Sequence, residues 1–140
     1  MEYKRFGNEI VARFDPQDEI IDCVLKIAKA EDIKLASVRA IGATDDFTVG
    51  VFNMEKKAYD EFTFTGNHEI TNLAGTLSTM NGEYYQHLHI TCAGPGAAIV
   101  GGHLLKAVIS LTCEVVITVI DGKVDRKRNE AIGINGFCFD

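Results

Sequence analysis

The sequence YYQHLHITCAGPGAAIVGGHLL, residues 84–105, holds three of the four histidines in this chain of 140 residues. His87 and His89 stand two residues apart in a run of apolar, β-branched and aromatic residues, which indicates a β-strand. Because side chains alternate along a strand, both imidazoles point to the same face. The stretch therefore predicts a strand that carries two histidines side by side.

The third histidine of this stretch, His103, follows a glycine pair after a glycine-rich turn. That turn can bring its imidazole back beside the strand. Two imidazoles at a fixed spacing and a third from a neighbouring segment match an open three-histidine site for a divalent metal. Zinc is the first expectation, since imidazole suits zinc, copper, nickel and iron, whereas calcium and magnesium prefer oxygen. Spacing alone also allows hydrogen-bonded core histidines or a polar groove.

Strands outnumber helices in the rest of the sequence. One main helix is predicted, with Asp15 as its N-cap, Pro16 in its first turn, an apolar stripe at helical spacing and an end near Glu31. The other expected strands are 9–14, 35–42, 47–53, 61–65, 69–77, 107–120 and a closing strand at 136–139. We expect turns at 56–57, 66–68 and 81–82, with His68 exposed in the second. This pattern favours an α+β fold, a mostly antiparallel β-sheet with the helix packed on it.

Length and composition limit the class of protein. A chain of 140 residues suits a single domain, 1–140, and 46% hydrophobic with 24% charged residues is ordinary for a soluble protein. No apolar run approaches the roughly 20 residues of a membrane span, and no secretory signal opens the sequence. We therefore expect a cytoplasmic protein with no membrane partner.

The formal net charge of −6 makes nucleic acid an unlikely partner, since nucleic-acid binding needs a basic patch to neutralise phosphates. The basic cluster at 123–128 is diluted by Asp121 and Asp125, and we expect it to be a solvated turn. The four cysteines, at positions 23, 92, 113 and 138, form no Cys-x-x-Cys pair and are expected to be reduced core residues.

Glu114 stands inside the predicted strand 107–120. A carboxylate within a sheet is costly unless it is paired or hydrogen-bonded. It has three candidate roles: a partner or proton carrier for the histidines, an ion pair with an arginine such as Arg39, or a place in a seam between subunits. If the site is catalytic, Glu114 and Glu83 are the nearby carboxylates that a hydrolase would use as general base.

Several blocks of the sequence resemble the PPC domain family, also called DUF296, which plants and prokaryotes share. The blocks cover nearly the whole chain in the family's order, and the Gly-Gly-His-Leu block is the most specific. They are 40–43 (Ala-Ile-Gly-Ala), 57–59 (Lys-Ala-Tyr), 69–70, 73–75, 87–90 (His-Leu-His-Ile), 94–96 (Gly-Pro-Gly), 100–105, 113–117, Arg128 and Gly133.

The resemblance implies the same α+β fold and a homotrimer whose long strands are exchanged across subunit interfaces. It also places His87, His89 and His103 in the family's most specific blocks. The family is commonly labelled as DNA-binding. That label looks as if it has been extended from plant members, which carry separate basic AT-hook motifs. No Arg-Gly-Arg-Pro core of an AT-hook occurs here. A trimeric metal-binding or small-molecule-binding domain is the favoured reading, with a DNA-associated regulator and a zinc-dependent enzyme as alternatives.

Overall fold

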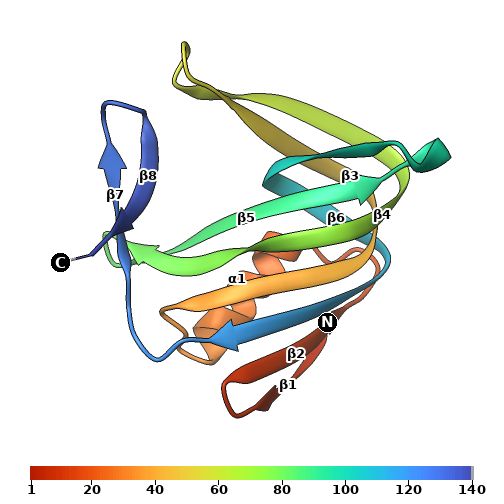
Figure 1. Ribbon diagram of the computed structural model, residues 1–140. Helices are drawn as coiled ribbons and strands as arrows, with labels where there is room; N and C mark the ends of the chain where they lie inside the picture. Colours follow the sequence, from red (N-terminus) through yellow and green to blue (C-terminus); the bar gives the residue numbers. More distant parts are fainter. Residues whose placement is uncertain (140) are drawn as a thin grey trace.

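The structure is a computed structural model that describes residues 1–139, and it is a mostly antiparallel β-sheet with one α-helix among those residues (Figure 1). This confirms the fold class expected from the sequence. The elements are β1 (Glu2–Phe6), β2 (Glu9–Phe14), α1 (Ile20–Ala30), β3 (Ala36–Asn53), β4 (Ala58–Met80), β5 (Glu83–Ala93), a 3₁₀ turn at Pro95–Ala97, β6 (Ile99–Val119), β7 (Asp125–Asn129) and β8 (Ile134–Cys138).

The sheet is built around four long strands. Strand β3 pairs with β4 and β6, and β5 pairs with the same two strands, so that β3, β4, β5 and β6 form a closed cycle of antiparallel pairs. The β1–β2 hairpin extends the sheet beyond β6, and the β7–β8 hairpin extends it beyond β4. Figure 1 shows β7–β8 standing beside the end of β4 and the start of β5, with the tip of the β3–β4 hairpin projecting away from the body.

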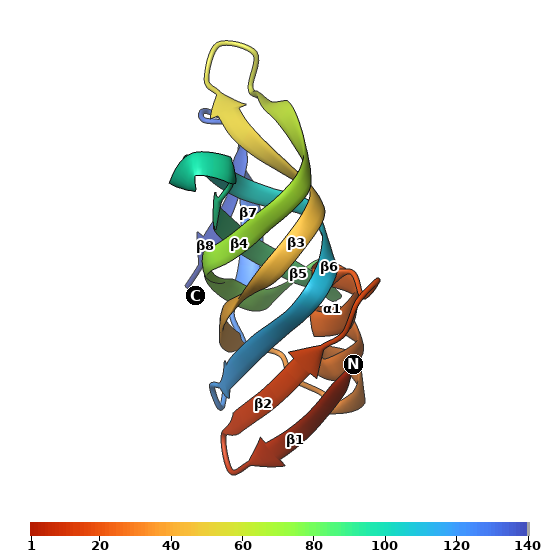
Figure 2. The same ribbon diagram turned by 90° about the vertical axis from the view of Figure 1, so that its right-hand side faces the viewer.

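Helix α1 covers one face of the sheet, where it contacts β5 and β6 (Figures 1 and 2). Its buried side chains follow the helical period, which explains why an amphipathic segment is stable here. They are Ile20, Cys23, Val24, Ile27 and Ala28. They join the buried side chains of β2, β3 and β6 in one hydrophobic core.

The helix begins later than the sequence predicted. Residues 15–18 form a turn, in which the Asp18 amide donates to the Asp15 carbonyl at 3.0 Å. The Asp15 side chain binds Arg13 and the amino group of Met1, and the Arg13 guanidinium in particular lowers the pKa of that carboxyl to about 2. The N-cap is Glu19, whose carboxylate accepts from the Asp22 amide at 2.8 Å. The predicted end near Glu31 is confirmed.

The predicted hairpin turn at 66–68 is wrong. Strand β4 runs through this segment and pairs with β3 on both sides of it, so the predicted strands 61–65 and 69–77 are one strand, as are 35–42 and 47–53. The glycine signal reflects a local irregularity, because Gly66 has φ +84° and the pairing of β3 with β4 shifts register opposite it. His68 is half-buried and lies edge-on to Phe47, at 5.0 Å between ring centroids.

The segment 123–128 is also different from the predicted solvated turn. Residues 125–129 form β7, which pairs with β8 and buries the side chain of Arg126 to 5% exposure. The closing strand was predicted correctly, although it starts at Ile134. The turns at 56–57 and 81–82 are confirmed.

The four cysteines form no disulfide within residues 1–139, and three of them are buried. Burial raises the pKa of the Cys92 thiol to about 11, as expected for unreactive core residues. None of the helical segments in residues 1–139 is both long and apolar enough to span a bilayer.

Candidate metal centre

Strands β5 and β6 bring the three histidines together. The two strands pair antiparallel, with His89 directly opposite His103. His87 precedes His89 by two residues on β5, so its side chain points to the same face. The glycines before His103 allow this pairing to be close, since a Cβ on Gly101 would lie 2.4 Å from the Ile90 carbonyl oxygen. The face shared by His87 and His89, predicted from strand parity, is therefore observed, and so is the return of His103.

The geometry of the cluster fits a metal ion. One ring nitrogen from each histidine lies within 4.8 Å of the other two. The Nε2 atoms of His87 and His89 are 3.2 Å apart. Two ligands of a tetrahedral zinc with bonds of 2.0–2.1 Å would be separated by about 3.3 Å. The group of three histidines can therefore hold a divalent metal with small movements of the rings.

Burial favours the neutral form of two of the three histidines, His87 and His103. It lowers the pKa of His103 to about 4, with smaller effects from His87 and His89. Burial also lowers the pKa of His87, followed by the charges of Arg126 and His89. The Nδ1 atom of His103 is buried without a hydrogen-bond partner among the described residues. Neutral imidazoles with free lone pairs are the form that binds metals.

The ring of Tyr59 supports His103 from the β3–β4 hairpin. The two rings are stacked at 4.7 Å between centroids with an interplanar angle of 19°. Gly50 makes room for this contact, because a Cβ there would lie 2.6 Å from the Tyr59 ring. Phe52 meets Tyr59 edge-on at 5.3 Å. The hairpin therefore fixes one wall of the site.

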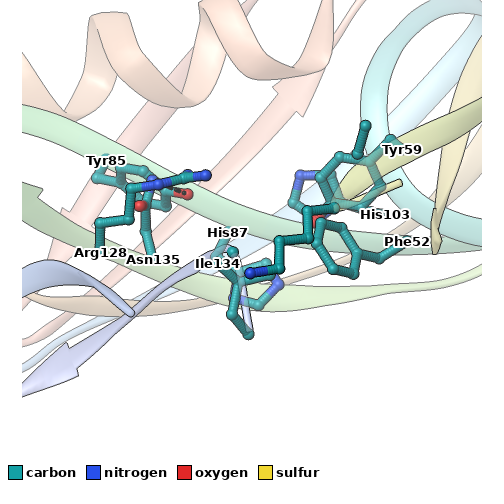
Figure 3. Close-up of a pocket in the computed structure, with 11 residues that line it drawn as sticks. Phe52, Tyr59, Tyr85, His87, His103, Arg128, Ile134 and Asn135 are labelled. Carbon is teal, nitrogen blue, oxygen red and sulfur yellow. Dashed lines mark hydrogen bonds between the residues drawn. The ribbon is translucent and has the colours of Figure 1, made fainter. Parts of the chain in front are cut away.

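A cavity of about 340 Å³ adjoins the histidines (Figure 3). Figure 3 shows His103, Tyr59 and Phe52 at one end, and Tyr85, Arg128 and Asn135 at the other, with His87 and Ile134 between them. The remaining lining residues are Lys57, Ala58 and Gly133. The cavity thus joins residues of β3, β4, β5, β6 and β7–β8 at one place.

Arg126 is buried against two residues that line the cavity, Tyr85 and Asn135, and sequence reasoning missed it. Its guanidinium donates to Ser78 Oγ at 2.9 Å, the Asn135 carbonyl at 3.0 Å and Thr76 Oγ1 at 3.1 Å. It also lies over the rings of Tyr85 and Phe137, at 4.8 and 4.2 Å from their centroids. The sequence around it is an unbroken run of four charged residues, 125–128, which equally fits a solvated turn.

The two carboxylates considered in the sequence do not join the site. Glu114 is exposed on β6, where it lies opposite Arg13 of β2 and Ile41 of β3. Glu83 is exposed at the start of β5. Neither lines the cavity. Of the three roles considered for Glu114, contact with the histidines is not found within the described chain, because Glu114 stands opposite Ile41 whereas His103, on the same strand β6, stands opposite Gly50.

These features belong to a known class of protein domain. The model of the Plants and Prokaryotes Conserved (PCC) domain matches residues 1–121, and the chain is a member of this family. The family assignment made from the sequence blocks is thereby confirmed. Among curated proteins, the comparison finds no match.

Solved structures resemble the whole chain. A protein from Bacteroides thetaiotaomicron, with a provisional DNA-binding label, is 34% identical with a TM-score of 0.95 over 99% of this chain and 96% of that one. The metal-containing protein from Archaeoglobus fulgidus is 25% identical, with a TM-score of 0.89 over 99% and 97%. A plant- and prokaryote-conserved protein from Pyrococcus horikoshii shares the fold. It is 24% identical, with a TM-score of 0.86 over 99% of this chain and 94% of that one.

Proposed function

We propose that this PCC-domain protein binds one divalent metal ion, zinc, through His87, His89 and His103. The observation that carries the proposal is the meeting of three imidazoles from two paired strands. Three protein ligands would leave one position for water or a bound molecule, where zinc acts as a Lewis acid. The similar protein from Archaeoglobus fulgidus is described as metal-containing, which supports this assignment.

The test is a calorimetric titration of metal-free protein with zinc. We expect one zinc per chain in the wild type. His89→Ala and His103→Ala should each weaken binding at least about 100-fold, because the loss of an outer partner of a ligand already costs 10–100-fold. Elemental analysis of protein purified without an affinity tag identifies the metal acquired in cells.

His68 provides the matched control. It is the fourth histidine, and it packs against Phe47 and Phe64 outside the cluster. His68→Ala should leave zinc affinity unchanged, even if it lowers thermal stability. A wild-type protein that binds no zinc, or ligand variants that bind as well as the wild type, would contradict the proposal.

We also propose that the chain assembles as a homotrimer, as the family resemblance implies. Large apolar side chains remain exposed on the strands, among them Val11 on β2, Ile41 on β3 and Leu111 on β6. The tip of the β3–β4 hairpin adds Val51, Met54 and Phe62. Exposed apolar area on this scale is typical of a surface that another subunit covers.

Sequence-independent binding to DNA is disfavoured by charge. The chain carries 20 acidic and 14 basic residues, and Arg126, one of the basic residues of 123–128, is buried. We expect weak or no binding to duplex DNA at physiological salt. A fluorescence anisotropy titration checks this, and a tight complex with a steep salt dependence would contradict it.

A further inference from the structure

The cavity beside the histidines has a positive lining in an acidic protein. Lys57 and Arg128 line it, and no aspartate or glutamate is among its lining residues within the described chain. Lys57 Nζ donates only to the Glu130 carbonyl, at 3.0 Å, among the contacts of residues 1–139. Arg128 has a long contact of 3.4 Å with the carboxylate of Glu130, which is 81% exposed. Such an exposed pair is weak, so the Arg128 guanidinium is available for a stronger acceptor.

A third positive charge, Arg126, contacts two of the residues that line the cavity, Tyr85 and Asn135. The buried guanidinium of Arg126 binds three neutral oxygens, and no carboxylate of the described residues pairs with it. Burying a cation without a counter-ion is costly, and burial lowers the pKa of Arg126. A bound anion above the Tyr85 ring would offset part of this cost. The three cations together create a positive potential that an anion would lower.

Two buried polar atoms at the cavity have no partner among residues 1–139. They are Nδ1 of His103 and Oδ1 of Asn135. Asn135 Nδ2 donates to the Tyr85 hydroxyl at 3.3 Å, which fixes the orientation of the amide and leaves Oδ1 as the acceptor without a partner. A buried acceptor without a donor destabilises the protein, so a natural one is explained best by a ligand. A bound metal would be the partner of the His103 imidazole nitrogen. The Oδ1 atom of Asn135 requires instead a group that donates an N–H or O–H.

The remaining walls are flat and apolar. The rings of Phe52, Tyr59 and Tyr85 face the cavity together with Ile134. Aromatic walls favour stacking with a planar body. The volume of about 340 Å³ is at the lower end of the range for pockets that hold small organic molecules. The size excludes polymers and suits a ligand of one or two rings.

We propose that this cavity binds a small, flat organic carboxylate. Its carboxylate is held by Lys57 and Arg128, and its planar body lies against Phe52, Tyr59 and Tyr85. A donor group reaches Asn135, and the opposite edge faces the histidine cluster. The inference rests on the proposed metal site only for that last contact, because the anion-binding groups belong to the turn between β3 and β4 and to the β7–β8 hairpin.

The experiment compares matched acids and amides. Benzoate, salicylate and nicotinate are titrated into zinc-loaded and metal-free protein, beside benzamide, salicylamide and nicotinamide, and binding is followed by NMR or calorimetry. At least one acid should bind about tenfold more tightly than its amide, because hydrogen bonds to charged groups contribute about 1.5–3 kcal/mol. Lys57→Gln and Arg128→Gln should each weaken that acid about tenfold.

Lys56→Gln is the control, since Lys56 neighbours Lys57 but pairs with Asp60 and does not line the cavity. It should leave acid binding unchanged. Inorganic phosphate is titrated alongside, and phosphate binding tighter than that of every acid would overturn the role of the flat body. The proposal would be overturned if the acids bind no more tightly than their amides. It would also be overturned if Lys57→Gln and Arg128→Gln bind the acids as tightly as the wild type does.

The failures of the two proposals are distinguishable. Zinc binding without any preference for acids would leave the metal site intact and remove the carboxylate site. Absence of zinc binding would remove the metal site, while acid binding that still depends on Lys57 and Arg128 would support the carboxylate site alone.

Discussion

Burial lowers the pKa values of His87 and His103 more strongly than neighbouring charge does. His103 has a pKa of about 4 in the folded protein against about 6.5 in an unfolded chain. Between these values the unfolded state binds more protons than the folded state. The free energy of unfolding therefore decreases as pH falls from about 6.5 through 4. Above this window both states hold a neutral imidazole, and His103 contributes no pH dependence.

We predict that metal-free protein melts at a lower temperature at pH 5 than at pH 7, and that His103→Gln reduces this difference. Thermal denaturation followed by circular dichroism in the presence of a chelator measures both. The carboxylates titrate alike in the two proteins, so the difference between their slopes isolates His103. Equal slopes would show that His103 is not buried in its neutral form.

At the scale of residues, the candidate site was predictable where a simple period decides it. The strand period of two put His87 and His89 on one face, and the glycine pair indicated the return of His103. Arg126 was not predictable, because its burial depends on Tyr85 of the distant strand β5 and on the pairing of β7 with β8, which places Phe137 opposite it. Local charge pattern carries no information about such partners.

Among the elements, helix α1 depends on a single side chain at its start. Glu19 accepts from the Asp22 amide through Oε2, and from the Ala107 amide of β6 through Oε1 at 3.0 Å. The carboxylate therefore caps the helix and also ties it to the sheet. Each of these bonds satisfies a backbone donor that would otherwise be unpaired.

We predict that Glu19→Ala lowers the free energy of unfolding by about 1–2 kcal/mol, as expected for the loss of an N-cap and one further hydrogen bond. Glu19→Gln should lie between wild type and alanine, since its amide keeps one acceptor oxygen. Denaturant unfolding measures the three proteins. An effect of the alanine variant no larger than that of Lys26→Ala, at an exposed position of the same helix, would contradict the capping role.

The apolar stripe of α1 and its end could be read from the sequence, but its start could not. Asp15 and Pro16 are good residues for a helix start, yet the Gln17 amide donates to the Ile109 carbonyl of β6 and has φ +74°. A contact with a strand some ninety residues away, as counted from the sequence positions of that pair, overrides the local preference. The same reason explains β4, where pairing with β3 and β5 overrides the turn signal at Gly66.

For the molecule as a whole, the prediction concerns assembly. Light scattering should give three times the chain mass at micromolar concentration. Ile41→Lys places a charge among the exposed apolar side chains and should shift the protein towards monomers, without loss of its circular dichroism spectrum. Lys29→Glu, on the exposed side of α1, is the control and should remain trimeric. A monomeric wild type would contradict the proposed assembly.

The β7–β8 hairpin carries Arg126, Arg128 and Asn135, but its backbone meets the rest of the sheet at one bridge, Thr79 with Asp125. Elements held by few backbone bonds open locally at a free energy well below that of global unfolding. The amides of this hairpin should therefore exchange with solvent faster than those of β3 or β6. Two of the cavity's polar residues, Arg128 and Asn135, thus belong to a unit that can open and close while the four long strands stay paired, and a bound molecule would slow that exchange.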